Sequence, residues 1–255
     1  MLCAFLLALA NASINAKRVY HGSAYNDATL ESTNPFWVAA STQVAKMDIE
    51  TGGIMLPIGS PAVLRHGPAD KKELALTFDD GPHGHFTPKL LDLLDRYRVK
   101  ATFFVIGKMA YKDPALLAEI ARRGHLVANH TFSHANLRRQ SLSDIETEYL
   151  AANNLIAAVT GQTPRFCRPP GGDRDGLTTR AAQLLGMTTV LWTADPLDYS
   201  NPGVDVLMAR LRPKVANGGI ILLHDGPVQT LPLLEILIPE MQAKGYTFVR
   251  LDKWI

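Results

Sequence analysis

Apolar and polar positions change their spacing along the chain from about residue 72 to the C-terminus. Short apolar runs there predict buried strands, and longer segments with apolar residues three or four apart predict helices. The expected strands are Glu73–Phe78, Ala101–Ile106, His125–Asn129, Phe166–Arg168, Thr188–Thr193, Gly219–Leu223 and Tyr246–Leu251. The expected helices are Pro88–Arg96, Asp113–Arg123, Ser143–Thr160, Leu177–Leu185, Val204–Val215 and Leu231–Ala243. This alternation predicts an α/β fold with right-handed crossovers, and we expect a (β/α) barrel of about seven parallel strands.

The segment before this array, residues 17–71, shows no sustained hydrophobic period. Four prolines interrupt it, and only the run Phe36–Ala40 is apolar enough to pack on a neighbouring element. We therefore expect an irregular N-terminal extension that wraps the main domain of residues 72–255.

Residues 1–16 contain a short apolar run that ends in the small residues Ala10, Asn11 and Ala12. Such a run is typical of an export signal, although no basic residue precedes Lys17. It is too short to cross a bilayer as a helix. We favour a signal peptide over a buried helix or strand, and expect a secreted, periplasmic or cell-wall-associated protein with no stable membrane span.

The composition of the 255 residues is that of a soluble globular domain, with 47% hydrophobic and 20% charged residues. The 26 basic and 24 acidic residues give a net charge of +2, which argues against a nucleic-acid partner. The two cysteines, Cys3 and Cys167, imply no disulfide framework, and Cys167 is expected to be a buried, inert thiol. We expect a monomer.

Two aspartates and two histidines give the strongest chemical signal. Asp79 and Asp80 end an apolar run, and His130 and His134 lie four residues apart. That spacing puts both imidazoles on one face of a helix. Two imidazoles and one carboxylate hold a divalent metal and leave positions open for water and substrate. The other carboxylate can then act as a base, whereas a turn built on Asp-Gly-Pro would need only one aspartate.

Further polar residues follow the expected strands. Arg168 ends the fourth strand in the segment Arg-Pro-Pro-Gly-Gly, Asp195 follows the fifth, and His224 follows the sixth. The carboxyl ends of barrel strands share one face, where active sites are built. We therefore expect Arg168 to reach a carboxylate near the metal, rather than to lie on the surface of a rigid loop. His83 and His85 have no such constellation, and a solvated loop is the preferred interpretation for them.

With these residues in view, the chain resembles the NodB-homology polysaccharide deacetylases, carbohydrate esterase family 4, over roughly residues 72–255. Five family blocks recur in order: Thr77–Pro82, His130–His134, Arg168–Gly172, Asp195–Tyr199 and Leu222–His224. The resemblance implies a deformed (β/α) barrel. It also implies that Asp80, His130 and His134 bind one divalent metal, usually zinc, with cobalt or another divalent ion as alternatives.

The same resemblance implies roles for the remaining residues. Asp79 would be the catalytic base, held ionised and oriented by Arg168. His224 would be the general acid, oriented by Asp195, and Leu222 would border the pocket for the acetyl methyl group.

Two positions depart from the family pattern. Gly171 stands where many members have a tyrosine whose backbone N–H faces the oxyanion, and Tyr199 stands where many have tryptophan. Both positions border the substrate groove, so the pattern leaves the identity of the glycan open.

The expected function is metal-dependent removal of N-acetyl groups from N-acetylglucosamine-containing glycan, such as peptidoglycan or a chitin-type polymer, with release of acetate. Within the family, an O-acetyl esterase acting on xylan-type glycan is an alternative. Outside it, a glycan-binding module with an inactive site and an Fe(II) oxygenase are alternatives, since two histidines and one carboxylate also hold Fe(II).

Overall fold

The computed structural model describes residues 33–50 and 62–255. The expected signal peptide, residues 1–16, lies outside the described residues, as does much of the expected extension. The fold is described below for the unit from Pro35 to Ile255.

The described residues form one sheet in which every neighbouring pair of strands is parallel. The strand order is β1-β6-β5-β4-β3-β2-β7, and β8 also pairs with β2. The strands are β1 (Val63–Leu64), β2 (Glu73–Asp79), β3 (Thr102–Val105), β4 (Leu126–Asn129), β5 (Phe166–Cys167), β6 (Thr188–Val190), β7 (Gly219–His224) and β8 (Thr247–Phe248). Seven of them match the expected strands, so the predicted parallel α/β fold is confirmed.

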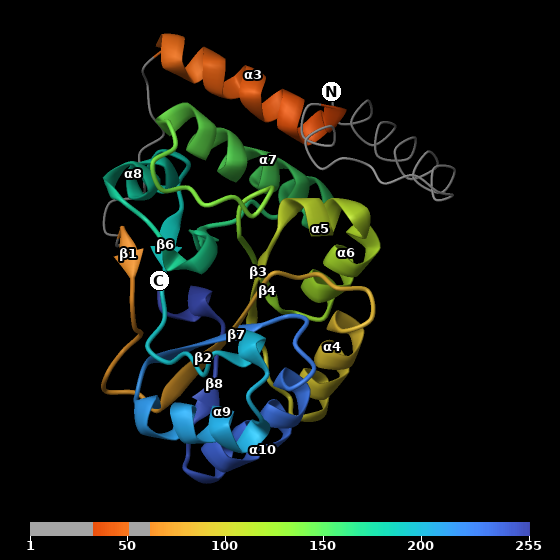
Figure 1. The fold of residues 1–255 in the computed structure, drawn as a ribbon, viewed down its shortest axis with the longest axis vertical. Coiled ribbons are helices and arrows are strands. Elements are labelled where there is room, and N and C mark those ends of the chain that lie inside the picture. Colours follow the sequence, from red (N-terminus) through yellow and green to blue (C-terminus); the bar gives the residue numbers. More distant parts are fainter. Residues whose placement is uncertain (1–32, 51–61) are drawn as a thin grey trace. The chain divides into compact units, whose positions relative to one another are not determined.

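Helices cover the outside of the curved sheet (Figure 1). They are α3 (Pro35–Glu50), α4 (Thr87–Arg96), α5 (Gly107–Lys112), α6 (Pro114–Arg122), α7 (Leu142–Thr160), α8 (Gly176–Leu184), α9 (Val204–Leu211) and α10 (Thr230–Ala243). Their ends follow ordinary capping chemistry. The Ser141 side chain accepts a hydrogen bond from the Asp144 N–H at the start of α7, and Gly161 ends that helix with φ 74°.

The barrel is incomplete. Residues 188–190 pair with β1 and β5, and the chain just beyond them turns to β7 instead. There, the Thr193 N–H donates to the Ile220 carbonyl at 2.9 Å, and the Leu222 N–H donates to the Ala194 carbonyl at 2.9 Å. These bonds bring the carboxyl-terminal ends of the β6 segment and β7 together, which narrows the barrel at one end.

The inner face of the sheet holds an apolar core, and the polar residues follow on the same face. Ala75 of β2 and Ile220 of β7 belong to this core. Because side chains alternate between the two faces of a strand, Thr77 and Asp79 continue the inner row of β2, and Leu222 and His224 continue that of β7. The register pairs Thr77 with Leu222 and Asp79 with His224, so the two rows end side by side at the mouth of the barrel.

The expectation of an irregular segment from residue 17 to residue 71 is wrong for its middle part. Residues 35–50 form the helix α3, which packs on α7 and α5. The Phe36 ring lies 6.3 Å from that of Tyr111, and the Trp37 ring lies 5.5 Å from that of Phe132. Phe36, Ala40 and Val44 are buried at four-residue intervals, which is the helical repeat that the prolines of the segment obscured.

Two further features are the state of the Cys167 thiol and the length and polarity of the helices. Cys167 is a free, buried cysteine, and burial raises the pKa of its thiol to about 12, as expected of an inert side chain. Each helix in the described ranges is too short or too polar to cross a lipid bilayer.

Candidate active site

Asp79 and Arg168 form a buried ion pair at the mouth of the barrel. Arg168 Nη1 lies 2.7 Å from Asp79 Oδ1 and donates to Thr77 Oγ1 at 2.9 Å. The guanidinium also donates to the carbonyl groups of Val190 and Leu191 and stacks 4.1 Å from the Phe104 ring centroid. Arg168 is fully buried, and this carboxylate is its ionic partner. The arrangement fixes the direction of one carboxylate oxygen and leaves the other to face the site.

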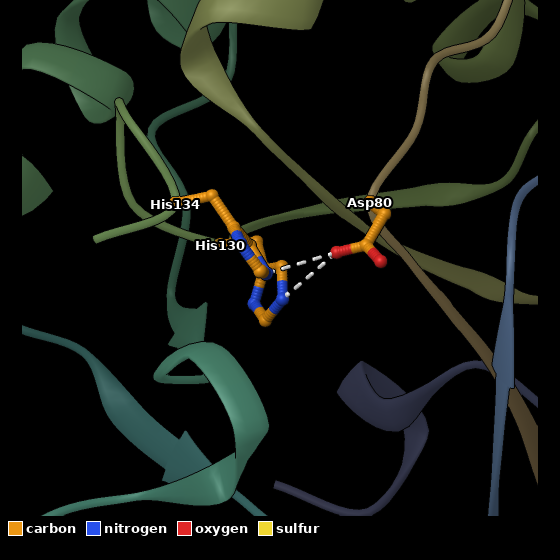
Figure 2. A group of neighbouring side chains, drawn as sticks. All are labelled: Asp80, His130 and His134. Carbon is orange, nitrogen blue, oxygen red and sulfur yellow. Dashed lines mark ion pairs between the residues drawn. The ribbon is translucent and has the colours of Figure 1, made fainter. Parts of the chain in front are cut away.

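Three side chains converge beside this pair. The carboxylate of Asp80 faces the neighbouring imidazoles of His130 and His134, with Oδ1 3.4 Å and 3.1 Å from their Nε2 atoms (Figure 2). One ligand atom from each residue falls within 4.8 Å of the others, as in a group that can hold a metal ion. Asp79 Oδ2 lies 3.7 Å from the same His130 Nε2. Both aspartates therefore face one imidazole.

Asp80 reaches this position through an unusual backbone conformation. Neighbouring residues of a strand point to opposite faces, so Asp79 and Asp80 would diverge if β2 continued. Asp80 instead has φ 75°, in the left-handed region that aspartate tolerates better than most residues. The chain turns at this residue, and both carboxylates end on the same side.

The imidazole of His130 is oriented by the protein. Its Nδ1 lies 2.7 Å from the Arg168 carbonyl oxygen, which can only accept a hydrogen bond. Nδ1 therefore carries the proton, and the lone pair of the neutral ring is on Nε2, the atom that faces Asp80. Such a carbonyl partner is common behind a metal-binding histidine.

The helical interpretation of the His130–His134 spacing is wrong. Residues 130–134 form a loop between β4 and α7. Thr131 has φ 67° and His134 has φ 64°, both incompatible with an α-helix. The two imidazoles still lie close together, with ring centroids 5.0 Å apart, because the loop reverses direction between them and not because it forms a helix.

His224 ends β7, next to Asp79 in the register of β2, and is paired with Asp198, not with Asp195 as expected. Its Nδ1 lies 2.7 Å from Asp198 Oδ1, and its backbone N–H donates to Asp198 Oδ2 at 2.8 Å. Thr230 Oγ1 donates to the same Oδ2 at 2.7 Å. Asp195 Oδ1 instead accepts from the Leu197 N–H at 2.7 Å, as in a turn.

The sequence held both carboxylates in the same block, Asp195-Pro-Leu-Asp198. The short 3₁₀ helix Asp198–Ser200 determines which of the two carboxylates contacts His224. Leu197 has φ 61°, which turns the chain so that the side chain of Asp198 points inward and is fully buried. No simple spacing rule identifies this turn.

Neighbouring ionisable groups shift the pKa values of His224 and Asp80. Burial alone would lower the pKa of His224, but Asp198, helped by the charges of Asp79 and Asp80, outweighs it and raises that pKa. Burial also opposes ionisation of Asp80, yet the imidazoles of His130 and His134 lower the pKa of its carboxyl below the usual range. The site therefore combines a carboxylate that stays ionised with an imidazole that keeps its proton more readily than usual.

Three further residues were expected to touch substrate, and two of them, Tyr199 and Leu222, lie beside His224. The Tyr199 ring is 57% exposed and meets that of His224 edge-on, with centroids 5.3 Å apart. Leu222 is buried on the inner face, next to His224 in the same row. Gly171 has φ 63°, and apart from its chain neighbours no atom lies within 4 Å of the point where a side chain would begin, so the space beside it is open.

The comparisons with known proteins agree with this geometry. The family model described as polysaccharide deacetylase matches residues 66–190. A peptidoglycan-N-acetylglucosamine deacetylase of Bacillus cereus is 36% identical over 73% of this chain and 89% of its own length. A chitooligosaccharide deacetylase of Sinorhizobium fredii is 41% identical over 67% of this chain and 86% of its own length.

The solved structures show the same relationship. That of a peptidoglycan N-acetylglucosamine deacetylase bound to an N-hydroxybenzamide compound superposes with a TM-score of 0.74 at 34% identity, covering 76% of this chain and 92% of the other. Sequence identity above 30% across most of the relatives' length, together with a shared fold, leaves one assignment: the chain belongs to the polysaccharide deacetylase family.

Proposed function

We propose that this protein is a metal-dependent hydrolase that removes N-acetyl groups from a glycan containing N-acetylglucosamine. The observation that carries the proposal is that two residues, each held by a charged partner, lie at the same mouth of the barrel as the three possible metal ligands. Asp79, paired with Arg168, and His224, paired with Asp198, belong to the paired strands β2 and β7. A base and an acid thus flank the cluster of Asp80, His130 and His134.

The residues of that cluster fit a divalent metal. Asp80 Oδ1 is buried and accepts no hydrogen bond from any described residue, although two imidazole nitrogens lie close to it. Two neutral imidazoles and one carboxylate form a donor set that suits zinc. The chemistry that such an ion supplies is Lewis acidity, which polarises a carbonyl group and lowers the pKa of water.

Asp79 is assigned as the general base. Arg168 holds its Oδ1, while Oδ2 faces the metal cluster and is placed to accept the proton of an attacking water. The water oxygen bonds to the acetyl carbonyl carbon as this proton moves to Asp79. The ion pair with Arg168 holds the carboxylate in place and orients it during the step.

His224 is assigned as the general acid. An amine is a poor leaving group unless it is protonated, so the carbon–nitrogen bond needs a proton donor on the side away from the base. His224 gives its proton to the leaving nitrogen as that bond breaks, which yields acetate and a free amine. The Gly171 N–H is assigned as the donor to the oxyanion, and Leu222 and Tyr199 as contacts of the acetyl group and the sugar.

The test is acetate release from three acetylated polymers: peptidoglycan, oligomers of N-acetylglucosamine, and acetylated xylan. We expect release from one or both N-acetylated substrates, in air and equally under nitrogen without a reductant. Release from xylan alone would favour the esterase alternative. Activity that requires oxygen would favour an oxygenase, and binding without release would favour a glycan-binding module.

We also propose that the protein acts outside the cytoplasm. The support is the apolar run at the N-terminus and the cell-wall substrates in the names of the relatives. N-terminal sequencing of the protein recovered from the producing cells tests this, since removal of about the first dozen residues is the result expected of a signal peptide.

A further inference from the structure

A buried carboxylate from another element binds the backbone of the loop that joins His130 and His134. Glu148 lies in α7, is 4% exposed, and reaches the loop from outside the barrel. Its Oε2 accepts hydrogen bonds from the N–H groups of Phe132 and Ser133, both at 2.9 Å. Its Oε1 accepts a hydrogen bond from Ser133 Oγ.

These bonds fall in the middle of a strained turn. The two residues that Glu148 holds, Phe132 and Ser133, lie between Thr131 and His134, which both have left-handed φ. A non-glycine residue in that region is strained, so such a conformation persists only where its surroundings fix it. Successive backbone N–H groups also form a natural site for an anion.

The rest of the loop backbone is held from the other side. The N–H groups of Gly107 and Lys108, at the start of α5, donate to the carbonyls of Thr131 and Phe132 at 2.9 Å and 2.8 Å. Glu148 therefore supplies the acceptor for the two middle amides of the loop, as α5 supplies the donors for the Thr131 and Phe132 carbonyls. His134 itself is exposed, and its backbone N–H is held within the loop by Thr131 Oγ1.

We propose that Glu148 is a positioning residue for the metal centre. Its carboxylate fixes the Phe132–Ser133 turn and thereby keeps the His134 imidazole within reach of Asp80. The inference rests on the proposed metal cluster and goes beyond it, because Glu148 would touch neither metal nor substrate. His134 would thus be positioned through the loop backbone, whereas the imidazole of His130 is held directly by the Arg168 carbonyl.

The experiment measures zinc affinity by competition with a chromophoric chelator. Residues behind the ligands of a metal typically change its affinity by about 10- to 100-fold, and we expect a loss in that range for Glu148→Ala. Glu148→Gln should stay within a few-fold of the wild type. Its amide oxygen still accepts the two backbone bonds, and its NH₂ group can donate to Ser133 Oγ.

A matched control separates positioning from general stability. Glu73 is another buried glutamate with two side-chain donors, Lys253 and Trp254, but it lies at the amino end of β2, away from the site. Glu73→Ala should lower the melting temperature of the metal-free protein and leave zinc affinity unchanged. The Co²⁺ absorption spectrum gives a second readout, which should change in Glu148→Ala and not in Glu73→Ala.

Wild-type zinc affinity in Glu148→Ala would overturn the proposal, as would an equal loss in Glu73→Ala. If Glu148→Ala does not fold, Glu148→Asp decides, since its shorter side chain withdraws the carboxylate from both amides and should weaken zinc binding several-fold. The variant His134→Ala separates this inference from the metal site itself. If His134→Ala binds zinc like the wild type, the proposed cluster is wrong as well.

Discussion

Asp79 and Asp80 are adjacent, chemically identical side chains placed in different surroundings. Asp79 meets the guanidinium of Arg168, and Asp80 meets two imidazoles. The left-handed backbone of Asp80 allows both to face the site. Each therefore takes a role that the other cannot fill.

This division predicts the behaviour of Asp79→Asn. The variant should keep its zinc because Asp80 and both histidines remain, and should lose turnover by roughly 10²- to 10⁴-fold because an amide cannot accept the proton. Zinc content by elemental analysis and acetate release by a coupled assay check the two halves. Loss of zinc together with partial activity at high zinc would show that the two aspartates exchange these roles.

Asp195 and Asp198 provide a second matched pair. Asp198 raises the pKa of His224, and the proposed mechanism uses the acid form of His224, so activity should fall as the pH rises through that pKa. Asp198→Asn removes the charge, which should move the alkaline limb of the pH–rate profile to lower pH and reduce turnover by roughly 10²- to 10⁴-fold. Asp195→Asn should leave the alkaline limb of the profile and the turnover rate nearly unchanged. The opposite ranking of the two variants would contradict the assignment of Asp198.

At this scale, the sequence indicates residue types more reliably than partners. The Asp79–Arg168 pair was predictable because Arg168 has a fixed place at a strand end. The partner of His224 was not, because a single left-handed residue, Leu197, decides which aspartate turns inward.

Among the elements, the central strands were the most predictable. Every residue of β2 is buried, so its apolar run stands out in the sequence. The strand β1 has two residues and α5 has six, too few for a hydrophobic period to appear. For α3, the helical repeat lies in a segment interrupted by prolines, which is why the sequence predicts an irregular chain there.

The strand β4 begins beside a buried histidine whose titration should affect stability. The Ala101 N–H donates to His125 Nδ1 at 3.1 Å, and burial lowers the pKa of His125 from 6.5 to about 4. As the pH falls from 6.5 towards 4, the unfolded chain binds a proton here and the folded chain does not. Folding stability is therefore complete above about pH 6.5 and declines below it.

Between about pH 7.5 and about pH 5, this residue should lower the free energy of unfolding by up to about 2 kcal/mol. His125→Asn keeps an acceptor near the Ala101 N–H and cannot titrate, so its unfolding free energy should depend less on pH by about that amount. Urea unfolding of both proteins in the presence of a chelator checks the difference. Equal pH dependence in the two proteins would show that His125 titrates normally in the folded state.

For the molecule as a whole, the parallel sheet explains why a site could be predicted before any contact was known. The residues assigned to catalysis and metal binding follow the carboxyl ends of β2, β4, β5 and β7, which meet at one mouth. The surrounding loops are less predictable, as the left-handed Gly171 and the exposed Tyr199 show. We expect the glycan to be selected by such loops, where the sequence is least informative.

The central claim is that one divalent ion at Asp80, His130 and His134 is required for deacetylation. Its most direct test is a titration of the metal-free protein with zinc, with acetate release from an N-acetylated glycan measured at each addition. We expect no release without zinc, a linear rise, and a plateau at about one zinc per chain, with no rise in His134→Ala. Full activity in protein shown by elemental analysis to contain no metal would contradict the account.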